Sequence, residues 1–331
     1  MKKLVLMFVA LFSMSASVFA DGLTATLQQG DNMQAFFGQD AFKQAYEAAQ
    51  SSGAIITLSE GTFNPVESIE KSMTIIGYSG FESSKTNIAN MKILADNVKI
   101  EGIYFSGNVE LGKISNCYIK RCYLNSRLTS TETHINTFID QCVVKYDYAI
   151  GTSVNYVIKN STLCGFYTNN TNKAQIINCV IWVWCSGSGY SGDSNVKQPY
   201  ATYMNNVLGG YNSGDISYTC NVASEFYYNY FAKTYGGTDA YKISYPQDCV
   251  NQGNYSASSE YFFYYNSDYR FPAVENWNDK KGMDGTVVGI KGGSGFASSP
   301  DIPRITSSSI DNCTDSQGKI NVKISAKIGS N

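Results

Sequence analysis

A short pattern of hydrophobic and polar positions recurs along the middle of the chain, between Val98 and Leu208. Each copy has an apolar residue, a variable residue, then Asn, Gln or Gly, and a small or apolar residue. A further apolar residue follows two positions later. The copies begin at Ile100, Ile114, Ile139, Ile158, Ile176 and Tyr203, and their third residues are 14, 25, 19, 18 and 27 positions apart. Short branched runs predict β-strands, and repetition near 20 residues predicts a solenoid.

The uneven spacing favours a parallel β-helix, because its strands stack in register while the loops at its corners vary in length. A corner between two strands suits a residue that adopts the left-handed α conformation, as Asn does. We therefore expect Asn116, Asn160, Asn178 and Asn205 at equivalent corners of stacked coils, about 4.8 Å apart. The alternative is an antiparallel sandwich of many short strands. The absence of Asn-Gly hairpin dipeptides disfavours that sandwich.

One helix is expected ahead of the repeats, from Asp40 to Gln50, with Asp40 as its N-cap. Its apolar face would contain Phe42, Ala45, Tyr46 and Ala49. A strand over 54–58, a turn and strand over 60–63 and a strand over 72–77 follow. We expect this region to cap one end of the solenoid and to cover strand edges that would otherwise recruit other chains.

Three of these segments, Asp40–Ala49, Ala54–Phe63 and Lys71–Gly77, resemble the N-terminal part of the pectin-lyase-like right-handed β-helix superfamily. Ser267–Phe271 and Asp284–Gly293 are similar to the closing segment of many secreted bacterial β-helix proteins. The resemblance covers roughly residues 35–295 and implies an all-β, single-stranded, right-handed parallel β-helix with an N-terminal capping helix. We expect one domain over 21–331, with the cap at about 36–63, coils at about 64–295, and a C-terminal strand and tail at 296–331.

The same fold hosts lyases, hydrolases, esterases and adhesins, so the resemblance does not specify an activity. The four arginines lie in no motif of the pectate lyases, which use acidic calcium-binding clusters and an arginine base. The Asn-Thr-Asp, Asp-Asp and Gly-His-Gly phrases of polygalacturonases are absent, and so are the aspartate and arginine phrases of pectin methylesterases. The sequence therefore predicts no catalytic residue, metal site or cofactor.

Residues 1–20 are typical of a secretory signal peptide, with Lys2-Lys3, an apolar run and a small-residue end at Ala20. No later apolar run approaches the roughly 20 residues that a membrane helix needs. A formal net charge of −2 gives no indication of nucleic-acid binding. We expect an exported protein that is periplasmic, extracellular or held at the cell surface.

Nine cysteines in an exported chain raise the question of disulfides, but the number is odd. Cys117, Cys142 and Cys179 each follow the third residue of the repeat, an interior position where cysteine behaves as a small hydrophobe. Only Cys117 and Cys142 would lie on adjacent coils, within reach of a disulfide. We expect mostly free, buried thiols.

Aromatic residues recur on the strands after these corners, where an outward row could stack on sugar rings. Cys122 and Leu124 suit the interior, so alternation turns Tyr123 outward. The predicted glycan-binding residues are Tyr123, Tyr148, Tyr167 and Trp184, with Asp147. The Gly- and Ser-rich loop over 186–199 would extend over this row.

Three alternatives to this site remain open. The aromatic residues could pack in the core or cover a solvated sheet. The chain could be a polysaccharide lyase or glycoside hydrolase of an unrecognised family that uses Asp or Glu side chains. It could also be a structural or adhesive surface protein. The prediction that the sequence favours is an exported binder of a polysaccharide or surface glycan, without catalysis.

Overall fold

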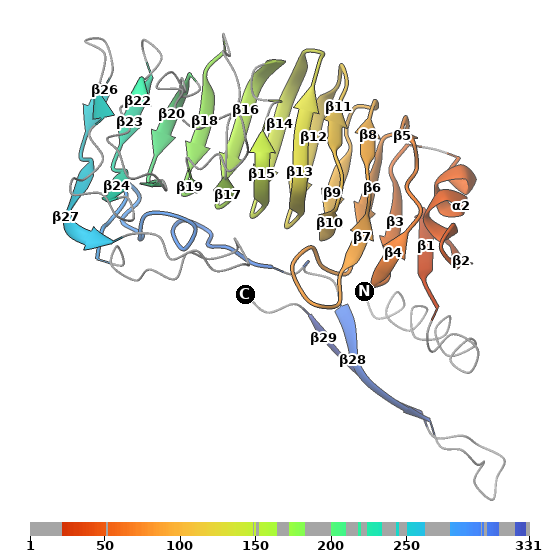
Figure 1. The fold of residues 1–331 in the computed structure, drawn as a ribbon. Coiled ribbons are helices and arrows are strands. Elements are labelled where there is room, and N and C mark those ends of the chain that lie inside the picture. Colours follow the sequence, from red (N-terminus) through yellow and green to blue (C-terminus); the bar gives the residue numbers. More distant parts are fainter. Residues whose placement is uncertain are drawn as a thin grey trace, which may run out of the picture.

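The computed structural model describes residues 22–50, 52–147, 149, 152–163, 172–182, 200–209, 218–219, 224–233, 243–244, 250–261, 279–298, 300, 303–310 and 322–328. Over these residues the chain forms a parallel β-solenoid of about seven turns, seen as a row of stacked strands in Figure 1. The coil strands between Ile100 and Leu208 pair in parallel, which confirms the predicted β-helix and rules out the antiparallel sandwich.

One wall of the solenoid, sheet A, contains twelve strands of the described chain. From β3 onward its strands pair in parallel, while β1 pairs antiparallel with β2 and β3. In spatial order the strands of sheet A are β2 (Asn32–Phe37), β1 (Thr24–Gln29), β3 (Ala54–Leu58), β6 (Met73–Ile76), β9 (Lys99–Glu101), β12 (Ser115–Lys120), β14 (His134–Asp140), β16 (Ser153–Lys159), β18 (Ala174–Ile177), β20 (Ala201–Met204), β23 (Glu225–Tyr227) and β26 (Val250–Gln252).

The facing wall, sheet B, contains thirteen strands of the described chain. Its main path is β27 (Tyr255–Tyr261), β24 (Tyr230–Lys233), β21 (Val207–Gly209), β19 (Val180–Trp182), β17 (Thr162–Leu163), β15 (Val143–Asp147), β13 (Tyr123–Ser130), β10 (Ile103–Phe105), β7 (Thr86–Ile88) and β4 (Gly61–Phe63). The strands β11 (Val109–Leu111), β8 (Met91–Ile93) and β5 (Ser68–Ile69) branch from it.

Two small sheets lie outside these walls. β22 (Tyr218–Thr219) pairs with β25 (Ile243–Ser244) in parallel. β28 (Pro303–Ile310) pairs with β29 (Val322–Ile328) in an antiparallel hairpin, which extends away from the coils in Figure 1. Both strands lie in the segment 296–331, where the sequence predicts a C-terminal strand and tail.

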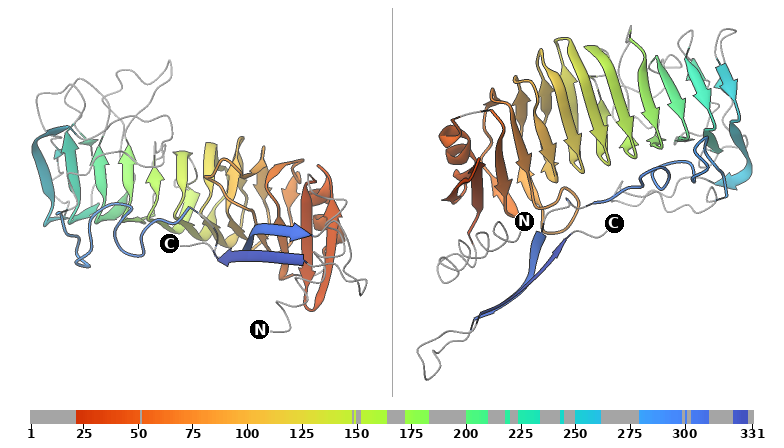
Figure 2. Two further views of the ribbon diagram at one scale, coloured as in Figure 1. Left: turned by 90° about the horizontal axis from the view of Figure 1, so that it is seen from below. Right: turned by 180° about the vertical axis from the view of Figure 1, so that it is seen from behind.

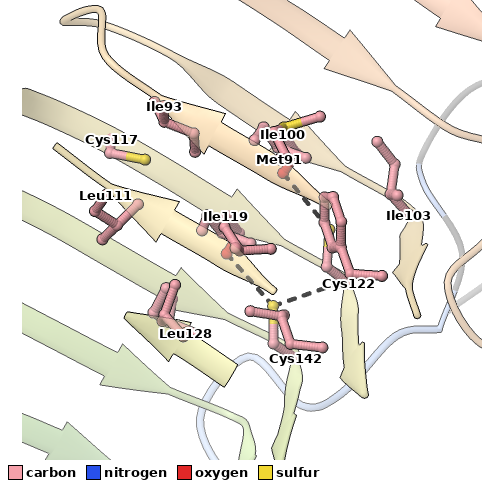
Figure 3. Packing of buried hydrophobic residues seen from close by; sticks show 14 of the residues in the cluster. Met91, Ile93, Ile100, Ile103, Leu111, Cys117, Ile119, Cys122, Leu128 and Cys142 are labelled. Atoms are coloured by element: carbon pink, nitrogen blue, oxygen red, sulfur yellow. Dashed lines mark hydrogen bonds between the residues drawn. The ribbon is translucent and has the colours of Figure 1, made fainter. Parts of the chain in front are cut away.

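Rows of apolar side chains at equivalent positions of successive coils build the interior. The central row of sheet A is fully in register and consists of Ile75, Ile100, Ile119, Ile139, Ile158, Ile176, Tyr203 and Phe226. Figure 3 shows part of this core, where Ile100 and Ile119 face Ile103, Leu111 and Leu128. Full burial of each such side chain contributes about 1.5–3 kcal/mol to folding stability. Stacking buries these side chains between neighbouring coils, which a single coil cannot do by itself.

Two separate rows of residues with positive φ bend the coils. The first row, which we call the corner row, joins sheet A to sheet B and consists of Gly102, Arg121, Gln141, Asn160, Asn178, Asn205, Tyr228 and Gly253. The second row lies near the start of the sheet A strands and consists of Asn97, Asn116, Asn136 and Asn155. The prediction was right for Asn160, Asn178 and Asn205 and wrong for Asn116. Because Asn suits both rows, the sequence pattern could not separate them, and Arg121 occupies the corner assigned to Asn116.

The helix ahead of the repeats is α2 (Ala41–Ala48), which buries Ala41, Phe42 and Ala45. Asp40 occupies the N-cap position without a side-chain capping bond, and its carboxylate instead accepts a hydrogen bond from Asn64 Nδ2 at 2.8 Å. Figure 1 shows α2 beside β1 and β2, at the end of the solenoid where the chain begins. A capping role for this helix stays a prediction.

From Arg121 onward, the residue that follows each corner belongs to an interior polar ladder. In coil order its members are Cys122, Cys142, Ser161, Cys179, Asn206, Asn229 and Asn254. The backbone N–H of one member commonly donates to the side chain of the next, as Cys142 does to Ser161 Oγ at 3.0 Å. Satisfying buried backbone donors in this way avoids a cost of about 1–3 kcal/mol for each.

The cysteine prediction is only partly right. Cys117, Cys122, Cys142 and Cys179 are free and buried, and the other five cysteines lie outside the described residues. The adjacent-coil pair, however, is Cys122 and Cys142. Cys117 belongs to another interior row, opposite Thr137, because it follows Asn116 in the second row.

The segment over 279–298 together with Pro300, which we call the strap, returns along the outside of the corner row. Both views in Figure 2 and the view in Figure 1 show it running beneath the coils, from β27 towards β7. Near one end Tyr255 Oη donates to the Lys281 carbonyl at 3.0 Å, and near the other end Ser79 Oγ donates to the Ser298 carbonyl at 3.4 Å. The strap therefore contacts both the last coils and the first.

Candidate functional site

The residues predicted to bind glycan do not form an exposed row in the described part of the chain. Leu124 is buried in the core, so Tyr123 does face away from the interior as predicted. It is nevertheless only 8% exposed, because its ring packs 5.2 Å from Tyr104 and 5.9 Å from Phe81. Tyr148, Tyr167, Trp184 and the loop over 186–199 lie outside the described residues.

The strap is the physical reason why this face is closed. Tyr123 belongs to an outward row of sheet B whose next coil contributes Val143. Farther along the same row, Val180, Val207 and Tyr230 form one buried cluster with Val288 and Ile290 of the strap. A ligand cannot reach these side chains while the strap is in place.

Asp147 lies inside the solenoid rather than on its surface. It pairs in register with Leu128 and occupies a core position of sheet B. Its two carboxylate oxygens accept hydrogen bonds from Tyr156 Oη at 2.8 Å and from the Ala149 N–H at 2.9 Å. Asp147 is fully buried, so its predicted place beside an exposed aromatic row is wrong.

His134 completes this interior polar cluster. Its Nε2 lies 2.9 Å from the Ala149 carbonyl and its Nδ1 lies 2.8 Å from Thr137 Oγ1, an arrangement that suits the neutral ring. Burial lowers the pKa of His134, against a smaller raising effect of the Ala149 carbonyl. Burial also raises the pKa of Tyr156, and the neighbouring Asp147 raises it further. The cluster fixes the loop after β15 to the coil.

The outer face of sheet A offers a different surface, on the three adjacent strands β12, β14 and β16. Tyr118, Phe138 and Val157 are half-buried and stand in register, and Ile135 and Val154 stand in register beside them. Ile135 and Val154 are 42% and 37% exposed. We call these five residues the sheet A patch. The patch therefore places two rows of apolar side chains on the outer face of three successive coils.

Amides run along this surface between its two apolar rows. Asn116 Nδ2 donates to Asn97 Oδ1 at 3.0 Å, Asn136 Nδ2 donates to Asn116 Oδ1 at 2.9 Å, and Asn155 Nδ2 donates to Asn136 Oδ1 at 2.8 Å. Each bond uses one of the two hydrogens of an amide, so a second N–H remains to face solvent or a ligand. We call these four residues the amide row. The sequence pattern did not reveal this row, because Asn116 also fits the pattern of the corner row.

Alternating charges border the patch on the side of the corner row. Glu101, Lys120, Asp140 and Lys159 stand in register, and Lys159 Nζ lies 3.8 Å from Asp140 Oδ2. Burial raises the pKa of Asp140, while Lys159 and other nearby cations oppose that shift. Arg121 donates to Glu101 Oε1 at 3.0 Å. The border carries both signs of charge and therefore gives no single-sign field.

The described residues contain no group of three or more His, Cys, Asp and Glu side chains arranged to hold a metal ion. None of the helices in the described part of the chain is long and apolar enough to cross a membrane. Within those residues, the sheet A patch and its amide row place exposed apolar side chains beside side-chain amides.

No protein-family model, curated protein or solved structure matches the chain. The parallel β-solenoid is a finding of the structure itself, and membership of the pectin-lyase-like superfamily stays a prediction from the sequence.

Proposed function

We propose that this chain is an exported protein that binds an extended glycan along the outer face of sheet A. The observation that carries the proposal is that Asn116, Asn136 and Asn155 of the amide row lie on the same three coils as the sheet A patch. A sugar ring has apolar C–H faces and a rim of hydroxyls. Apolar side chains beside unused amide N–H groups match both parts of such a ligand.

The repetition of the surface supports an extended ligand. Coils about 4.8 Å apart repeat the same apolar and amide positions along the solenoid axis. A polymer lying along that axis meets several weak contacts in succession, so its affinity depends on multivalency. Tyr118 and Phe138 stack on each other at 5.5 Å, so they present ring edges outward and form a floor rather than a sugar-stacking platform.

A matched pair of variants tests the proposed site. Ile135 in the patch and Val250 on β26 are both 42% exposed and both lie on sheet A, but Val250 is outside the patch. Ile135→Thr combined with Phe138→Ser should reduce glycan-array signal at least tenfold, while Val250→Thr should leave it unchanged. Circular dichroism checks that all variants fold. Unchanged binding by the patch variant would place the site elsewhere.

Failure of the unmodified protein to bind any glycan would favour a structural or adhesive surface protein.

Export has an independent test. Mass spectrometry of the protein from its native cell envelope should give a mature N-terminus at Asp21, following removal of the signal peptide at Ala20.

A further inference from the structure

The strap runs against the order of the coils. Its early residues bond to late coils: the Met283 N–H donates to Asn205 Oδ1 and the Gly289 N–H donates to the Asn205 carbonyl, both at 2.7 Å. Its later residues bond to earlier coils, because Gln141 Nε2 donates to the Gly295 carbonyl at 2.9 Å. Beyond these, Pro300 lies against Gly102. One short segment thus connects coils that are remote from one another in sequence.

Asn160 shows how closely the corner row holds the strap. Its Nδ2 donates to the Gly292 carbonyl at 2.6 Å, and its Oδ1 accepts a hydrogen bond from Ser294 Oγ at 3.0 Å. Asn160 is buried beneath the strap, so both bonds are shielded from water. Bonds of this kind contribute about 0.5–1.5 kcal/mol each. The corner amides therefore bind the strap as well as bending the coils.

On Gly282 and Gly293 of the strap, an added Cβ would collide with side-chain amides of the corner row. A Cβ on Gly282 would lie 2.5 Å from Asn205 Cγ, and a Cβ on Gly293 would lie 2.2 Å from Asn178 Nδ2. Gly295 is a natural comparison. It has the same left-handed backbone as Gly293, with φ of 71° against 57°, but a Cβ there would have no neighbour within 4 Å. Close approach to the corner row, and not backbone conformation alone, requires Gly282 and Gly293.

The last coils of the solenoid, around β26, are where a connection to earlier coils affects local opening most. In a solenoid each coil contacts only its neighbours, so end coils open more readily than central ones. The last sheet A strand, β26, has all three residues exposed, and one of them is the polar Asn251 at the position that Phe226 fills in the coil before. The last coils therefore have little packing of their own on that side.

We propose that the strap is a latch that couples the coils into one unfolding unit by binding late and early coils together. Opening the last coils while the early ones stay folded requires the strap to leave the corner row, with loss of the corner bonds and of the Val288 and Ile290 contacts. The proposal does not depend on glycan binding.

Hydrogen exchange of the full chain tests the latch. Gly282→Ala and Gly293→Ala should accelerate exchange at least tenfold in β20, β21, β23 and β24, while β3 and β6 keep their protection. Gly295→Ala, the control for backbone strain, should change exchange in the late strands less than threefold. Equal effects of Gly293→Ala and Gly295→Ala, or equal acceleration in all strands, would overturn the proposal.

A milder variant covers the case in which a glycine variant does not fold. Ser294→Ala removes only the hydroxyl that donates to Asn160 Oδ1. It should accelerate exchange in the late strands by roughly threefold to tenfold, the range that loss of one shielded hydrogen bond allows. No change in β20 and β23 with Ser294→Ala would also contradict a latch.

Discussion

The backbone N–H of Cys122 donates a hydrogen bond to Sγ of Cys142 on the next coil, at 3.4 Å. Farther along the same ladder Ser161 supplies an oxygen, and Asn206 and Asn229 supply amide oxygens, to the equivalent donor. The position therefore selects a small acceptor that fits the interior rather than a thiol as such. This explains why cysteines recur there without forming disulfides.

The thiols provide the first prediction. Burial raises the pKa of Cys117 and of Cys179 to about 12, so these thiols stay protonated at neutral pH. We expect the folded, non-reduced protein to leave Cys117, Cys122, Cys142 and Cys179 unreactive towards a thiol reagent at pH 8. Denaturant should then release at least four reactive thiols. A count of three or fewer would show that the buried cysteines are paired.

The interior ladder predicts a strong effect at Asn229. Its Oδ1 accepts hydrogen bonds from the N–H and from Nδ2 of Asn206, both at 3.0 Å. Asn229→Leu leaves the buried Asn206 N–H without an acceptor, and Asn206 Nδ2 keeps only its bond to the Ile176 carbonyl, so the free energy of unfolding should fall by at least about 2 kcal/mol. Asn229→Ser keeps an acceptor, as Ser161 does in its own coil, and should cost less. Urea unfolding measures both, and equal losses would argue against a hydrogen-bonding role.

Two variants of Asn136, in the amide row, distinguish the cost of backbone strain from the loss of side-chain hydrogen bonds. Asn136 has φ of 53° and its amide links Asn116 to Asn155. Asn136→Gly loses both bonds but tolerates the left-handed backbone, whereas Asn136→Ala loses the bonds and adds strain. We expect the alanine variant to be less stable than the glycine variant by about 1–2 kcal/mol in urea unfolding. Identical stabilities would mean that the backbone relaxes at this position.

His134 predicts a dependence of stability on pH. Burial lowers its pKa in the folded protein, so the unfolded chain binds the proton more readily. Stability should therefore be complete above the unfolded pKa of about 6.5 and fall as the pH drops below it, by up to about 1.4 kcal/mol per pH unit. The His134 ring contacts Thr137, the Ala149 carbonyl and Tyr156, and Asp147 accepts hydrogen bonds from Tyr156 and from the Ala149 N–H.

The control for this prediction is His134→Gln, which can still donate to the Ala149 carbonyl but does not titrate. Thermal unfolding between pH 7.5 and 5 should show the loss in the parent protein and not in the variant. Asp140 acts in the opposite direction, since its raised pKa makes the folded state gain stability as the carboxyl protonates. Subtracting the pH dependence of the variant's stability from that of the parent protein removes the contribution of Asp140. A variant with the same pH dependence as the parent would assign the effect to another group.

Sequence periodicity predicted the coils because each one obeys local rules. One coil shows the pattern of an apolar residue, a corner and an inward apolar residue at Ile139, Gln141 and Val144. The next coil repeats it at Ile158, Asn160 and Leu163. Such a pattern depends on alternation and on conformational preference, which are properties of short segments. The parallel solenoid, the free thiols and the corners at Asn160, Asn178 and Asn205 were accessible in this way.

The candidate site was not accessible from periodicity. Asn116 satisfies the corner pattern but lies in the amide row, since one residue type suits two left-handed positions and only the pairing with Asn97 and Asn136 separates them. Asp147 was placed outside because alternation alone does not fix the register of its strand, whereas its pairing with Leu128 puts it in the core.

By itself the sequence determined the class of fold, the alternation that turns Tyr123 away from the core, and the small, buried character of the cysteine positions. Only the tertiary structure decided which outward surface is open. The strap covers Tyr123 and its row through contacts with residues far away in the chain, such as Phe81 with Phe296. Local sequence patterns indicate whether a side chain faces the interior of the solenoid or its outside. They do not indicate that a distant segment packs over the outside, because several of the contacts that hold it join residues more than a hundred positions apart, as Asn160 and Gly292 are.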